Sequence, residues 1–159
     1  MSICGEHSLV SDGIACTLRC RRWTCDFCRP ILEAELERKA GAGDATIFLT
    51  LTCDPSRHEC PDEAARSIKL AWTQVRRMFQ RQFGMLLPFL AVFEHTANGW
   101  PHLHLLIRAD GVIPQRWLST QMARLIGAPT VFIRSARKGD ATYIAKGPHK
   151  FKGCKRHWA

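Results

Sequence analysis

The order of residue patterns after Ala45 predicts an α+β fold: a ferredoxin-like (split βαβ) antiparallel sheet with its helices on one face. Three observations support this prediction. Short segments alternate apolar and other residues, two longer segments place apolar residues at helical spacing, and their order is strand, helix, strand, strand, helix, strand, then a last short helix. A cysteine-rich stretch precedes these patterns. We therefore expect a small zinc-binding segment with a short helix at residues 1–43 and a single compact domain at residues 44–159.

The first predicted elements are a helix, a strand and a second helix. Pro30–Ala40 is rich in Glu, Leu, Arg and Lys, and Gly41-Ala42-Gly43-Asp44 then interrupts the helical pattern. Thr46–Thr52 alternates β-branched and apolar residues, which predicts a strand. Glu63–Phe83 places apolar side chains on one helical face, and Gly84 is typical of the residue that follows a helix.

The next two strands should form a hairpin. Phe89–Phe93 and His102–Ile107 are separated by Asn98-Gly99, a strong turn signal between two strands. The remaining predicted elements are an amphipathic helix at Pro114–Ile126, a strand at Thr130–Arg134 and a short helix at Asp140–Lys146.

The triplet His102-Leu103-His104 predicts a metal site on this hairpin. Side chains two apart on a strand project from the same face, roughly 6.6 Å apart, so both imidazoles can approach one ion. Glu94, which hairpin pairing would bring beside His102, is the expected third ligand. If the helices cover the leucine face, these side chains stand on the open face. Two histidines and one carboxylate leave coordination positions free for catalysis. A pair of surface histidines with a salt-bridged glutamate is the alternative.

Tyr143, the single tyrosine of the chain, lies three residues before Lys146 on the last predicted helix, hence on the same helical face. A tyrosine nucleophile needs help, because forming the phenolate at pH 7 costs roughly 4 kcal/mol. Lys146 is positioned to offset part of this cost or to hold a phosphate. The alternative is a tyrosine that caps the core with its hydroxyl at the surface.

Five of the eight cysteines lie in the first 43 residues. The predicted zinc ligands, spaced C-x3-C-x4-C-x2-C, are Cys16, Cys20, Cys25 and Cys28. Cys4 and His7 are rival ligands that could replace Cys16 and Cys20. Structural zinc would organise a segment too small to fold around its own core.

Charge indicates a polyanionic partner. The chain has 23 basic and 14 acidic side chains, a net charge of +9, and residues 134–159 hold eight Lys and Arg against the single acid Asp140. This excess favours nucleic acid, with a solvated basic tail as the alternative. The candidate DNA-binding residues are Arg134, Arg137, Lys138 and Trp100, with a buried Trp100 as the alternative for the last of these.

Neither a signal peptide nor an apolar run long enough to span a membrane is visible in the sequence. We therefore expect the protein inside the cell, where thiols stay reduced and cysteines bind metals more often than they form disulfides.

Three motifs follow one another along the chain: Phe48-Leu49-Thr50-Leu51-Thr52, Trp100-Pro101-His102-Leu103-His104 and Tyr143-Ile144-Ala145-Lys146. Together they resemble the motifs of HUH endonucleases, specifically the rolling-circle replication initiator (Rep) proteins of small single-stranded DNA phages and plasmids. The cysteine-rich segment ahead of the first motif is also similar to phage-type members.

The resemblance implies a metal-dependent single-stranded DNA endonuclease and strand transferase that acts at a replication origin in the cytoplasm of a bacterial host. His102, His104 and Glu94 would hold Mn²⁺ or Mg²⁺, and Tyr143 would form a 5′-phosphotyrosine link with help from Lys146. A host helicase or polymerase is a further candidate partner. Some relatives carry a second tyrosine where this chain has Gly139 or Gly147, so a single-tyrosine mechanism is implied.

Three other functions compete with this one. A zinc-stabilised nucleic-acid-binding module without catalysis would make the histidines incidental. A histidine-triad nucleotide hydrolase needs a histidine where this chain has Leu106. An iron oxygenase with two histidines and one carboxylate explains neither the basic C-terminal region nor the lone tyrosine.

Overall fold

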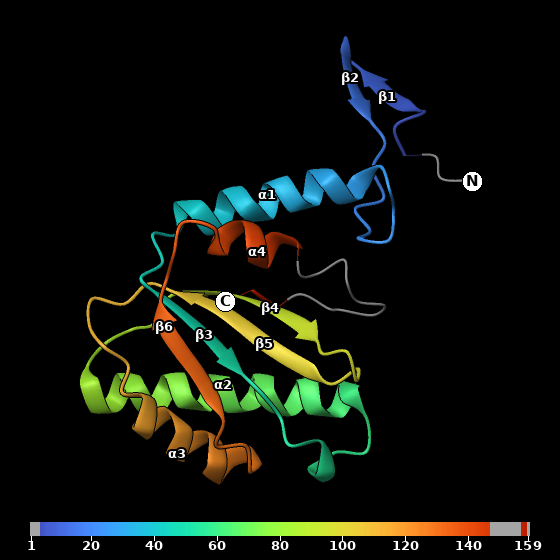
Figure 1. Ribbon diagram of the computed structural model, residues 1–159. Coiled ribbons are helices and arrows are strands. Elements are labelled where there is room, and N and C mark those ends of the chain that lie inside the picture. The colour runs from blue at the N-terminus through green and yellow to red at the C-terminus, as the bar shows by residue number, and fades with distance from the viewer. Residues whose placement is uncertain (1–3, 147–156, 159) are drawn as a thin grey trace.

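The computed structural model describes residues 4–146 and the strand at residues 157–158 (Figure 1). Its centre is an antiparallel sheet in the order β6-β3-β5-β4-β7. The strands are β3 (Ile47–Leu51), β4 (Phe89–His95), β5 (Pro101–Ile107), β6 (Val131–Ser135) and β7 (His157–Trp158). The four predicted strands are present within two residues of their expected bounds, and the short β7 adds an edge that the sequence did not predict.

Two helices cover one face of the sheet, as the split βαβ prediction requires. They are α2 (Pro61–Phe83) and α3 (Gln115–Ile126), and both end at a glycine in the left-handed conformation, Gly84 with φ +70° and Gly127 with φ +68°. Odd-numbered strand residues such as Leu49 and Leu105 point toward these helices and are fully buried in the main core. The α+β fold class is therefore confirmed.

Two further helices lie over the opposite face (Figure 1). They are α1 (Cys28–Ala42) and α4 (Asp140–Lys146). A second, smaller core forms where they meet the sheet, built from Leu36, Ala40, Phe48, Val92, Leu106, Ile144 and Ala145. Both helices present small or aliphatic side chains to the even-numbered strand residues. The face that carries the histidines is therefore partly covered, not open as expected from helices on one side alone.

The segment before α1 contains a β-hairpin that the sequence analysis did not predict. Strands β1 (Ser8–Ser11) and β2 (Ile14–Thr17) pair antiparallel and are exposed along their whole length. Asp12 and Gly13 join them with φ values of 52° and 77°, the positive values that a two-residue hairpin turn of this kind requires. The predicted division of the chain between residues 43 and 44 stays a prediction.

A short 3-10 helix, η1 (Pro55–Arg57), connects β3 to α2. Among the residues that the structure describes, no helix combines the length and the apolar character that crossing a membrane requires.

Candidate active site and cysteine cluster

The β4–β5 hairpin places the predicted ligand residues on one face of the sheet. Glu94 is the direct cross-strand partner of His102, and Val92 is the partner of His104. The turn that sets this register contains Gly99 with φ +82°, whose backbone N–H donates to the Thr96 carbonyl at 2.9 Å. The pairing expected from Asn98-Gly99 is therefore the pairing in the structure.

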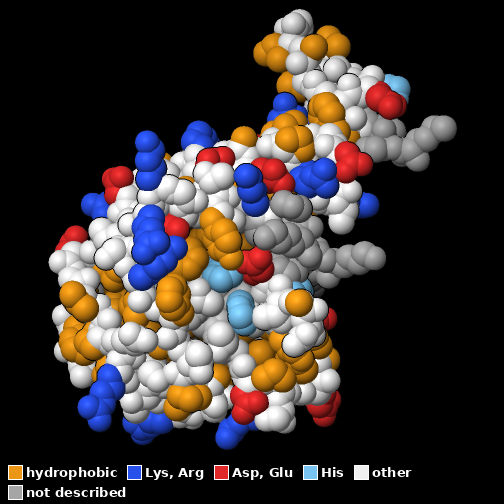
Figure 2. Space-filling model, viewed as in Figure 1, with side chains coloured by type: hydrophobic (Ala, Val, Ile, Leu, Met, Phe, Trp, Pro, Cys, Tyr) orange, Lys and Arg blue, Asp and Glu red, His pale blue; other side chains and the backbone are white. Residues whose placement is uncertain are grey.

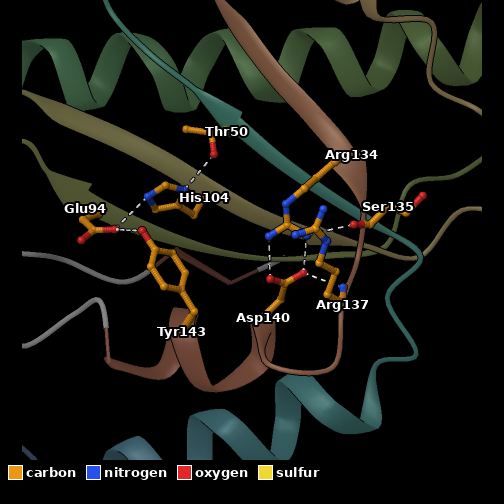
Figure 3. Close-up of polar contacts among 8 residues, drawn as sticks. All are labelled: Thr50, Glu94, His104, Arg134, Ser135, Arg137, Asp140 and Tyr143. Atoms are coloured by element: carbon orange, nitrogen blue, oxygen red, sulfur yellow. Dashed lines mark hydrogen bonds and ion pairs between the residues drawn. The ribbon is translucent and has the colours of Figure 1, made fainter.

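Tyr143 meets this pair of strands from α4 (Figure 3). Its hydroxyl donates a hydrogen bond of 2.7 Å to Glu94 Oε2. The same carboxylate oxygen lies 2.9 Å from His104 Nε2. Tyr143 and His104, which are far apart in the sequence, thus contact the same oxygen atom of Glu94. Tyr143 reaches this atom because α4 packs over this part of the sheet through Ile144 and Ala145.

Thr50 on β3 completes the arrangement from the other side of the imidazole. Its hydroxyl lies 2.9 Å from His104 Nδ1, and both residues are buried. A hydroxyl can donate or accept, so Thr50 can bond to Nδ1 whether or not that nitrogen carries a proton. The 2.9 Å contact of Nε2 with Glu94 needs a proton between the two atoms, whereas a cation bound at Nε2 would leave the imidazole proton on Nδ1, facing Thr50. An outer partner of this kind is typical of histidines that bind metals. Sequence reasoning missed Thr50, although strand alternation places it on the same face as His104.

His102 lies beside His104 but does not converge with it. Their ring centroids are 6.3 Å apart and the ring planes are inclined by 81°. Burial lowers the pKa of His102, and the Glu94 charge only partly opposes this effect. A depressed pKa keeps the imidazole neutral at neutral pH, which is the form that binds metals. The donor set therefore fits a divalent cation chemically, with Glu94 and His104 already together and His102 at the adjacent position on the same face.

The environment of Tyr143 keeps its hydroxyl protonated. Burial, together with the hydrogen bond to Glu94 and the charge of that carboxylate, raises the pKa of Tyr143 to about 12. The side chain is nevertheless 45% exposed, so it is accessible from solvent. Its ring packs edge-on to His104, with centroids 5.5 Å apart. Lys146 lies one helical turn further on and is exposed.

Arg134, a candidate DNA-binding residue, is paired with an acidic residue of the protein itself. Its guanidinium forms two hydrogen bonds with Asp140, of 2.7 and 2.6 Å, and lies 4.3 Å over the centre of the Phe48 ring (Figure 3). Asp140 also accepts a hydrogen bond of 2.7 Å from the Arg137 backbone. Arg134 therefore connects β6 to the start of α4, and its charge is matched inside the protein.

The other candidate DNA-binding residues lie on two different connections of the chain. Arg137 and Lys138 are exposed in the loop between β6 and α4. Trp100 is half-buried at the hairpin turn, where its backbone N–H donates to the Thr96 hydroxyl at 3.3 Å. Figure 2 shows histidine side chains at the centre of this face, with an acidic side chain, hydrophobic side chains and Lys or Arg around them.

A second site lies at the N-terminal end of α1. The sulfur atoms of Cys4, Cys20, Cys25 and Cys28 all lie within 4.8 Å of one another, which fits a closed four-thiolate metal site. Cys4 takes the position that the sequence analysis gave to Cys16, while Cys20, Cys25 and Cys28 are in the cluster as expected. Cys16 is exposed on β2 opposite Leu9, because the unpredicted hairpin carries it away from the cluster. Rival ligand His7 is exposed and outside the cluster.

Comparison with known proteins identifies a family. The family model described as Replication-associated protein ORF2 matches residues 46–152, which include all three motifs and exclude the cysteine cluster. No curated protein and no solved structure shows significant similarity to the chain.

Proposed function

This chain belongs to the replication-associated protein ORF2 family, and we propose that it nicks and rejoins single-stranded DNA at a replication origin by a divalent-metal-dependent transesterification. The observation that supports this proposal is the contact of Tyr143 with Glu94, and of Glu94 with His104. Tyr143 lies 39 residues after His104 in the sequence, and both side chains contact the same carboxylate oxygen. A phosphodiester bound here would be within reach of a nucleophile and of two metal ligands.

The proposed nucleophile is the Tyr143 hydroxyl. Its oxygen attacks phosphorus in line, a bond from tyrosine to the 5′-phosphate forms, and the bond from phosphorus to the 3′-oxygen breaks. The phenol loses its proton and the departing 3′-oxygen gains one, so a free 3′-hydroxyl remains that can prime synthesis. The new phosphodiester conserves the energy of the old one, and rejoining is the same reaction in reverse. Because Tyr143 is the single tyrosine, rejoining uses a DNA hydroxyl or a second copy of the protein.

Glu94, His104 and His102 are the proposed ligands of Mn²⁺ or Mg²⁺. A bound cation would polarise the scissile phosphate and offset the charge that develops in the transition state. A cation held by Glu94 would offset the charge of that carboxylate and compete with the Tyr143 hydroxyl for its oxygen, and so would weaken two of the causes that raise the phenol pKa. Lys146, one turn along α4, would hold a phosphate oxygen or stabilise the phenolate. The proposed structural zinc would be held by Cys4, Cys20, Cys25 and Cys28.

A covalent adduct tests this proposal. We would incubate the full chain and Mn²⁺ with single-stranded oligonucleotides tiled across the DNA that flanks its coding region, then separate the products on a denaturing gel. One strand should give a slower, protein-linked band, and Tyr143→Phe should abolish it because only the phenol oxygen is lost. His104→Ala should also abolish the band, while His7→Ala, which removes an exposed histidine outside the sheet site, should leave it unchanged.

The second candidate is a zinc-stabilised nucleic-acid-binding module without catalysis. The raised pKa of Tyr143 favours it, because a phenol held protonated by Glu94 is a poor nucleophile. Absence of an adduct on every tiled strand with either Mn²⁺ or Mg²⁺, combined with retained DNA binding, would support this candidate over the enzyme.

A further inference from the structure

Phe132 is an exposed aromatic residue on the same sheet face as the candidate active site. Its side chain is 56% exposed, whereas its neighbours Val131 and Ile133 pack into the main core on the other face. The position is on β6, an edge strand of the sheet. An isolated exposed apolar residue is common on protein surfaces, so exposure alone assigns no role.

The register of the sheet aligns Phe132 with the residues of the candidate active site. Phe132 is the direct cross-strand partner of Thr50, and Thr50 is the direct partner of His104. Directly paired residues project from the same face, so the three side chains form a row across β6, β3 and β5. At about 4.8 Å per strand, the Cα atoms of Phe132 and His104 lie roughly 10 Å apart. One short segment of a DNA strand could therefore touch both the exposed ring and the carboxylate that joins Glu94 to Tyr143.

Exposed positive charge lies beyond the far end of β6, whose second residue is Phe132. Arg137 and Lys138 are exposed in the loop that follows β6. Arg134, the next residue on this face of β6, is bound to Asp140 and leaves the phenyl ring as the group presented to solvent. Proteins hold single strands without reading their sequence by stacking bases on aromatic side chains, since every base has a π-face, while cations elsewhere along the strand contact its backbone.

We infer that Phe132 stacks on a base of the single strand whose phosphate Tyr143 attacks, and so places the neighbouring phosphodiester over Glu94 and His104. This inference rests on the proposed function, because it assumes that single-stranded DNA occupies the sheet face. Phe132 binds the strand and takes no part in bond making. It is a subsite that accepts any base, with preference for those that stack most strongly.

Binding to DNA with and without bases tests the inference. All variants would carry Tyr143→Phe and be measured without divalent metal, so that nicking does not enter the result. The probes are a labelled oligothymidine and a strand of equal length made entirely of abasic sites, each titrated by fluorescence anisotropy at one salt concentration. Phe132→Ala should weaken binding of oligothymidine by about 5- to 100-fold and leave binding of the abasic strand nearly unchanged. Phe132→Trp should bind oligothymidine as well as the parent does.

The matched control is Phe83→Ala, which removes a phenyl ring with 37% exposure from α2 on the opposite side of the sheet. This variant should bind both probes like the parent. Equal losses on both probes, an equal loss in Phe83→Ala, or unchanged binding by Phe132→Ala would each overturn the inference. A change in the sedimentation of Phe132→Ala without a change in its DNA affinity would also overturn the inference, because β6 would then be a contact between copies of the chain. An adduct assay that fails while the Phe132 result holds would reject the nicking chemistry and keep the subsite.

Discussion

Arg134 and Asp140 form a bidentate ion pair that joins the end of β6 to the first residue of α4. Asp140 is buried, and Arg134 also lies over the Phe48 ring, which in turn packs against both Tyr143 and His104. The pair therefore fixes the start of the helix that presents Tyr143 to Glu94. A strand residue that the sequence predicts to bind DNA thus also joins the helix of the proposed nucleophile to the sheet.

Asp140→Asn should lower the free energy of unfolding by about 1–3 kcal/mol at neutral pH, because Arg134 then keeps a buried partner without charge. The hydrogen bonds from Arg134, which outweigh the opposing effect of burial, lower the pKa of Asp140. A carboxyl whose folded pKa is depressed contributes stability above its unfolded pKa and loses it as the pH falls through the folded value. The difference between parent and variant should therefore shrink in acid. Denaturant titrations at several pH values measure it.

Asp110→Asn is the matched control for Asp140, because Asp110 is exposed in the loop after β5. It should change stability by less than about 0.5 kcal/mol. If both variants lose stability equally, or if the loss in Asp140→Asn does not vary with pH, the ion pair does not have the role described.

Because Tyr143 is the single tyrosine of the chain, tyrosinate absorbance reports the titration of this residue alone. Tyrosinate absorbance in the metal-free protein should appear near pH 12, since burial and Glu94 raise the pKa of Tyr143 to about 12. Glu94→Gln removes the charge and should move the midpoint down toward the ordinary value of about 10. Circular dichroism at each pH would verify that the protein is still folded. A parent midpoint already near 10 in folded protein would contradict the hydrogen bond between Tyr143 and Glu94.

Thr50→Val should weaken the binding of the proposed catalytic metal and leave the fold intact. Valine matches threonine in shape but cannot bond to His104 Nδ1, so the imidazole loses the partner that orients it. The Mn²⁺ concentration that gives half-maximal adduct should rise by about 10- to 100-fold. The adduct yield at saturating Mn²⁺ should recover. Thr52→Val, which changes an exposed hydroxyl bonded to the Thr130 carbonyl, is the control and should leave the Mn²⁺ requirement unchanged. A lower yield that no amount of Mn²⁺ restores would show that Thr50 has another role.

The two competing fourth zinc ligands can be separated by metal content. Purified protein should contain one equivalent of zinc per chain, and Cys4→Ser should lose most of it because Cys4 lies within the cluster. Cys16→Ser should retain zinc, since Cys16 is on the exposed hairpin. Elemental analysis of the three proteins decides the question. Retention by Cys4→Ser together with loss by Cys16→Ser would restore the ligand set expected from spacing alone.

Much of the sheet could be predicted because its signals are local. Alternation along Thr46–Thr52 and the Asn98-Gly99 turn fix which residues face which side, and so they placed Glu94 beside His102. The contact of Glu94 with His104 is diagonal, and side-chain rotation decides it, so spacing could not predict it. The partner of Arg134 depends on how α4 approaches β6, although Asp140 stood out as the one acid in a basic region.

The error at Cys16 has a different cause. Spacing along the chain takes no account of Asp12-Gly13, a turn signal of the same type as Asn98-Gly99. Once residues 8–17 are a hairpin, Cys16 is fixed within a strand, and Cys4 and Cys20 meet where the hairpin begins and ends. The layer formed by α1 and α4 was also missed, because Pro30–Ala40 shows no strong apolar stripe of its own.

The smaller core includes side chains from α1, a helix that lies ahead of the family-matching region. Residues 46–152 carry all three motifs, yet the helix before them shields Phe48, Leu106 and Ile144 from water through Leu36 and Ala40. A chain shortened to begin at residue 45 would keep Glu94, His102, His104 and Tyr143. It would expose to water the apolar side chains of the smaller core that α1 covers, next to the helix that carries Tyr143. Cys28 belongs to the thiol cluster and is also the first residue of α1. Disruption of the cluster should therefore disturb the packing of α1 against α4, the helix that carries Tyr143.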